Sequence, residues 1–123
     1  MFLRESGLAT NLDINLEALI TPTLDIGVPG GKEILFFAEA LIGSDRGALD
    51  KARMDLAETL GPASVTAASA IAANFTKNDR IANGCGIPTE PKMLNASQDI
   101  RVRLGLNEFR SAENTFKHFP EAR

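Results

Sequence analysis

The stretch AANFTKNDRIANGCGIP, residues 72–88, holds the side chains of this sequence that are best suited to chemistry. Asn78, Asp79 and Arg80 follow one another on a helical pattern that ends near Cys85. An amide, a carboxylate and a guanidinium within one turn can line a pocket for a small acid, because Arg pairs well with carboxylates. The same residues can instead hold helices together, with Asn78 hydrogen-bonded to a neighbouring helix end and Arg80 paired with a carboxylate. Both interpretations stay open.

The only cysteine and the only histidine argue against thiol and metal chemistry. Cys85 follows the C-terminal end of the predicted helix, where the helix dipole opposes a thiolate. His118 lies near the end of the chain, and we expect it to be a solvated surface residue. One histidine and one cysteine do not supply the usual ligands of a zinc or iron site, and a catalytic triad would have to recruit His118. The glycine-rich stretch at 27–31 fits no phosphate-binding spacing. Since the sequence lacks both a set of metal ligands and this spacing, we expect neither a metal nor a cofactor.

The composition excludes several classes of protein for this chain. The chain has 123 residues, which is the size of one domain, and its formal net charge of −3 lacks the basic excess of a nucleic-acid-binding protein. Trp and Tyr are absent, and no apolar run approaches the roughly 20 residues of a membrane-spanning helix. The first residues contain charges where a signal peptide would be apolar, and a lone cysteine cannot form an internal disulfide. We therefore expect a cytoplasmic protein that contacts neither nucleic acid nor membrane.

The periodicity predicts an all-α fold, an antiparallel helical bundle. Apolar residues recur at helical spacing over 30–43, 44–61 and 64–83, and Gly or Gly-Pro pairs end each pattern. The third helix is rich in alanine, which lets neighbours approach closely, so we expect it to be the most buried, with Phe75 in the core. These patterns divide the chain into an N-terminal arm packed on the core (1–30), a helical core domain (31–116) and a flexible tail (117–123).

Residues 71–88 resemble the closing helix of the AhpD-like family, which includes alkylhydroperoxidases and carboxymuconolactone decarboxylases. In that family the helix has an apolar residue followed by Phe-Asn, then an Arg and an Ala further along. A Gly-Ile or Gly-Val pair ends the run. The chain matches this run, with Asn and Phe in exchanged order, at Asn74, Phe75, Asp79, Arg80, Ile81, Ala82, Gly86 and Ile87. The likeness extends over about residues 31–110. It implies a helical domain that forms a homo-oligomer through its helical faces.

The family's redox motif, Glu-x-x-Cys-x-x-Cys-x-x-x-His, is absent from the chain. Neither Cys85 nor His118 occupies a motif position, so no catalytic residue carries over from the redox members. Two hypotheses follow from the resemblance. The first is a non-catalytic oligomeric module for binding or assembly. The second is an enzyme with altered chemistry, a decarboxylase, isomerase or peroxidase-related protein, whose candidate residues are Asn78, Asp79, Arg80 and Cys85 and whose ligand is a small molecule.

Overall fold

The computed structural model describes residue 7 and residues 9–123 of the chain. This part is helical, with no strand among the described residues, so the predicted all-α class is confirmed. The elements are η1 (Leu16–Leu19), α2 (Gly31–Ile42), α3 (Arg46–Leu60), α4 (Pro62–Cys85), α5 (Pro91–Ala96), α6 (Gln98–Arg103), η2 (Leu106–Glu108), η3 (Arg110–Ala112), α7 (Glu113–Phe116) and η4 (Pro120–Ala122).

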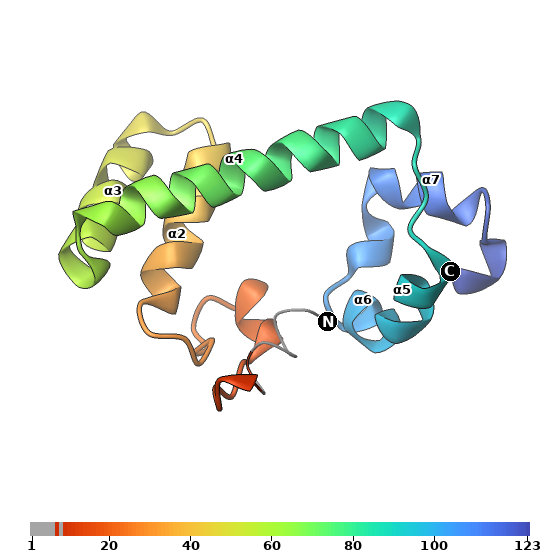
Figure 1. Ribbon diagram of the computed structural model, residues 1–123, viewed down its shortest axis with the longest axis horizontal. Helices are drawn as coiled ribbons and strands as arrows, with labels where there is room; N and C mark the ends of the chain where they lie inside the picture. The colour runs from red at the N-terminus through yellow and green to blue at the C-terminus, as the bar shows by residue number, and fades with distance from the viewer. Residues whose placement is uncertain (1–6, 8) are drawn as a thin grey trace.

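One long helix organises the molecule. α4 has 24 residues, which corresponds to a length of about 36 Å. Helices α2 and α3 lie against its N-terminal half, and α5, α6 and α7 gather below its C-terminal end (Figure 1). We call α2, α3 and the first half of α4 the N-terminal lobe. The segment from the end of α4 to residue 123 is the C-terminal lobe.

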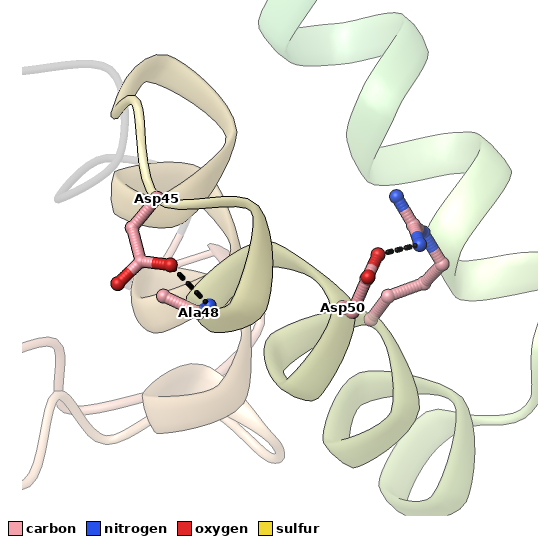
Figure 2. Close-up of polar contacts among 4 residues, drawn as sticks. Asp45, Ala48 and Asp50 are labelled. Carbon is pink, nitrogen blue, oxygen red and sulfur yellow. Dashed lines mark hydrogen bonds and ion pairs between the residues drawn. The ribbon is translucent and has the colours of Figure 1, made fainter.

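Short local signals explain where the three long helices begin and end. The Asp45 carboxylate accepts a hydrogen bond of 3.0 Å from the Ala48 backbone N–H and so caps α3 (Figure 2). Gly61, with φ of +86°, ends α3, and Pro62 starts α4 where no backbone donor is needed. Gly86, with φ of +66°, ends α4 in the left-handed conformation that favours glycine. The helices predicted over 30–43, 44–61 and 64–83 are therefore confirmed to within a few residues.

The hydrophobic core lies in the N-terminal lobe. Phe37 of α2 and Leu56 of α3 are 2% and 0% exposed and pack with Leu49 and Ala52 of α3. The first turns of α4 close this core, with Val65 and other side chains half-buried against it. Phe37 and Leu56 have the largest fully buried side chains of this cluster, so α2 and α3 supply most of the core.

The long helix is not the most buried element, and the expectation for Phe75 is wrong. Although every residue of α4 is described, none is buried, and Phe75 is 62% exposed. The alanine-rich face does contact a neighbour at Ala68, but only over the first turns, where α2 and α3 lie. Beyond that point one side of the helix is open. Ala68 and Ala82 are half-buried whereas Ile71 and Phe75 are exposed, so the apolar residues of the helix are divided between a covered side and an open side.

The C-terminal lobe has a smaller apolar core and more polar contacts. Its buried apolar side chains are Leu94 of α5 and Phe116 of α7. Thr115 is also buried, and its Oγ1 accepts a hydrogen bond of 2.9 Å from the Thr89 backbone N–H. The chain turns between α6 and η2 at Gly105, whose φ of +65° favours glycine. Helix α5 was not predicted, because Pro91 and a run of only six residues resemble a loop.

The segment before α2 contacts both lobes. Ile26 is buried against Gly31, where a Cβ atom would lie 2.2 Å from the Ile26 side chain. Glu17 of η1 forms an ion pair with Arg103 of α6, which raises the pKa of the Arg103 guanidinium mainly through their hydrogen bond. Residues 1–6 and 8 of the predicted arm lie outside the described residues. The division of the chain at residues 30 and 116 stays a prediction.

Candidate functional site

A cleft of about 860 Å³ lies between the second half of α4 and the C-terminal lobe. From α4 it is lined by Thr76, Asp79, Arg80 and Asn83, which are spaced by three and four residues and so share one face of the helix. The opposite wall mixes apolar and polar side chains: Ile87, Leu94, Leu106, Phe109, Arg101, Asn107, Ser111, Asn114 and Thr115. The cleft therefore brings a carboxylate and two guanidinium groups to one concave surface.

Asp79 and Arg80 are the two predicted site residues that line the cleft. Both are exposed and line the cleft with their helix neighbours Thr76 and Asn83. None of the ion pairs among the described residues includes Arg80, so the expected carboxylate partner is wrong for the single chain. An exposed guanidinium beside an open cleft is available to an anionic group from outside the chain.

The other candidates lie elsewhere. Asn78 and Cys85 are exposed on α4 and do not line the cleft, so the four candidate residues lie on different sides of the helix. Cys85 is the last residue of α4, at the carboxyl end of the helix. His118 is exposed, and its ring lies 6.4 Å from that of Phe119, between centroids. Within the described part of the chain, no group of three or more acidic, Cys or His side chains could hold a metal.

Sequence reasoning missed Arg101, the most constrained cation of the cleft. Its guanidinium donates hydrogen bonds to the Asn107 side chain at 2.6 Å, the Leu94 carbonyl at 3.2 Å and the Ala122 carbonyl at 3.3 Å. Its Nε atom is buried without a hydrogen-bond partner. These bonds join α5, η2 and the C-terminal residues, so Arg101 holds the floor of the cleft. The sequence DIRVRLG, residues 99–105, contains no signal that separates the two arginines. Arg101 turns inward, whereas Arg103 turns outward.

No protein-family model, curated protein or solved structure matches the chain. Among the described residues, no helix has the combination of length and apolar character that crossing a membrane requires.

A second surface is largely apolar and lies on the other side of α4. Its members are exposed and recur every three or four residues: Ala67, Ala70, Ile71, Asn74, Phe75, Asn78, Ile81 and Cys85. We call this set the outward face of α4. The three charged residues of the helix, Lys77, Asp79 and Arg80, all fall outside it. An uncharged face of this length on an exposed helix is unusual for a chain that stays alone in water.

A third surface is the groove between α2 and α3. Its volume is about 820 Å³, and its lining includes Phe36, Ala40 and Ala48. Lys32 lies over the Phe36 ring, with its Nζ atom 5.8 Å from the ring centroid. Lys51 and Asp55 form an exposed ion pair at the rim, and their hydrogen bond raises the pKa of Lys51. The described residues that line the groove include neither Cys nor His, so it offers no thiol or imidazole for catalysis.

Proposed function

We propose that this protein is a self-associating helical module of the AhpD-like type, which acts by binding or assembly and not by thiol redox chemistry. In this proposal the helices of two or more chains complete an antiparallel bundle that one chain leaves open.

The observation that carries this proposal is the surface of the single chain. The chain exposes 8795 Å², whereas a folded monomer of 13.2 kDa is expected to expose about 6,400 Å². The excess is about 2,400 Å², which lies at the upper end of the roughly 1,000–2,500 Å² that one subunit of an obligate oligomer buries. Large apolar side chains contribute to it, including Ile71 and Phe75, which are 60% and 62% exposed. Burying them is favourable by about 25 cal/mol per Å² of apolar area.

The AhpD-like assignment rests on the sequence of the closing helix. The residues that resemble the family's run are divided in the fold between the cleft, which has Asp79 and Arg80, and the outward face, which has Phe75 and Ile81. The cysteine pair of the redox members has no counterpart in the sequence. A disulfide-based peroxidase cycle needs a resolving thiol, so Cys85 alone does not provide it within one chain.

Light scattering of the purified protein at micromolar concentration tests the proposal. We expect a mass of at least twice the 13.2 kDa of one chain. A mass of one chain, unchanged on raising the concentration, contradicts self-association. Turnover of an alkyl hydroperoxide that is lost in Cys85→Ser contradicts the non-redox part of the proposal.

A second function is favoured by the cleft. Asp79, Arg80 and Arg101 surround a space large enough for a small acid, which fits an enzyme of altered AhpD-like chemistry, a decarboxylase or an isomerase. Calorimetric titration with small carboxylic acids tests it. Binding that Arg80→Ala abolishes, with melting and assembly unchanged, favours this enzyme. Loss of assembly in Arg80→Ala indicates that Arg80 has a structural role and contradicts this second function.

A further inference from the structure

We infer that two copies of this chain pair through the outward faces of their α4 helices, and that the helices run antiparallel. This inference rests on the proposed self-association and adds the surface, the orientation and the residues in contact. The occupant of the outward face is therefore a second copy of the same chain.

The first argument is the position of the outward face relative to the lobes. The half-buried residues of α4 include Val65, Ser69, Ala72 and Thr76, which form the side directed at α2, α3 and the cleft. The exposed positions of the outward face lie on another side of the helix, and no described part of either lobe covers them. A second helix can approach there along the length of α4, which is about 36 Å.

The second argument is the placement of the large apolar side chains along the face. Ile71 and Ile81 lie on either side of Phe75, and the three side chains are 60%, 53% and 62% exposed. In an antiparallel pair centred at about residue 76, Ile71 of one chain lies opposite Ile81 of the other, and the large apolar side chains cover one another as ridges fill grooves.

The third argument is charge. Residues 1–61 contain five Lys and Arg against ten Asp and Glu, whereas residues 62–123 contain eight against six. Antiparallel α4 helices place the acidic half of one chain beside the basic half of the other. A parallel pair would place the two acidic halves together, so the charge distribution favours the antiparallel arrangement.

Asn74 and Asn78 fit such an interface. Both are exposed within the apolar face, and Asn74 accepts a hydrogen bond of 3.1 Å from Lys77 of its own chain. A polar residue in an apolar helix seam disfavours alternative registers, because shifting the seam leaves its amide without a partner. The asparagines therefore give the pairing a defined register.

The first experiment compares two variants that place the same charge on α4. Phe75→Glu puts it inside the outward face, and Ala73→Glu puts it at an exposed position outside the face. We expect Phe75→Glu to raise the dissociation constant of the dimer at least about 100-fold while its far-UV circular dichroism stays helical. Ala73→Glu should keep the wild-type mass. Full assembly in Phe75→Glu overturns the inference.

The second experiment determines the orientation with a short bis-maleimide crosslinker. Ala67 and Cys85 are 18 residues apart on one helix, about 27 Å, so a short reagent cannot join these positions within a chain. In antiparallel helices the thiol introduced by Ala67→Cys lies near Cys85 of the partner subunit, and we expect a covalent dimer. The wild type and Ala73→Cys, each without a nearby thiol pair, should stay uncrosslinked.

The outcomes separate this inference from the broader proposal. Crosslinking of the wild type through Cys85 alone indicates parallel helices and overturns the orientation. An oligomer that none of these variants crosslinks or disrupts overturns the outward face as the interface and leaves self-association intact. A single-chain mass for the wild type contradicts self-association itself.

Discussion

The two lobes of this protein are stabilised in different ways. The N-terminal lobe has a contiguous apolar core around Phe37 and Leu56, to which three helices contribute. The C-terminal lobe has Leu94 and Phe116 as its buried apolar side chains and relies on hydrogen bonds from Arg101 and to Thr115. We therefore expect the N-terminal lobe to be the more robust scaffold, because apolar burial tolerates small shifts whereas a polar network does not.

The largest expected effect is on the core of the N-terminal lobe. Phe37→Ala removes a side chain that is 2% exposed, and we expect it to lower the free energy of unfolding by about 3–5 kcal/mol. Phe109→Ala makes the same chemical change at an exposed site and should stay within about 0.5 kcal/mol of the wild type. Urea unfolding followed by circular dichroism measures both. Equal losses would contradict the assignment of the core.

The second-largest expected effect is on the hydrogen bonds that Arg101 makes in the C-terminal lobe. Arg101→Met removes three hydrogen bonds, two of them to backbone carbonyls, so we expect a loss of about 2–3 kcal/mol that is confined to this lobe. Hydrogen exchange should accelerate in α5 and α6 while the amides of α3 stay protected. Arg103→Met, whose ion pair with Glu17 is exposed, should leave exchange unchanged. Loss of protection in α3 as well would make the lobes one cooperative unit.

A smaller effect concerns the start of α3. Asp45→Ala removes the cap on the Ala48 N–H and should cost about 1 kcal/mol. Asp50→Ala is the control, because Asp50 pairs with Arg53 on the surface, at 2.7 Å, and its loss should change stability by less than about 0.5 kcal/mol (Figure 2). Thermal melting of the two variants checks the difference. A larger loss in Asp50→Ala would show that the cap is not what starts the helix.

The smallest effect is a pH dependence in α3. The hydrogen bond to Asp55 raises the pKa of Lys51 above its ordinary 10.5 in the folded protein. A raised folded-state pKa means that the contribution to stability is present below 10.5 and is lost as the pH rises through the folded-state value. The melting temperatures of the wild type and Lys51→Gln should therefore differ slightly at a pH of about 8 and converge well above pH 10.5. A difference that grows with pH would contradict this sign.

Local sequence signals are enough to specify the helices of the N-terminal lobe and the end of α4. Asp45, Gly61-Pro62 and Gly86 act through their own backbone conformation or through bonds to residues within one turn, so the sequence contains the whole signal. The separation of Asp79 and Arg80 from Asn78 around the helix also follows from the helical repeat. Helix α5 was missed, because in so short an element tertiary contacts at Leu94 outweigh local preference.

Which helix faces are covered depends on contacts between elements that are distant in the chain. Periodicity shows that α4 has an apolar face containing Ile71 and Phe75, but it does not say what lies against that face. The structure places α2 and α3 on another side of the helix and leaves Phe75 exposed. It also selects Arg101 over Arg103 as the inward guanidinium, since the carbonyls of Leu94 and Ala122 come together only in the folded lobe. The physical reason is the same in both cases: burial depends on neighbours distant in the chain, and a helical repeat carries no information about them.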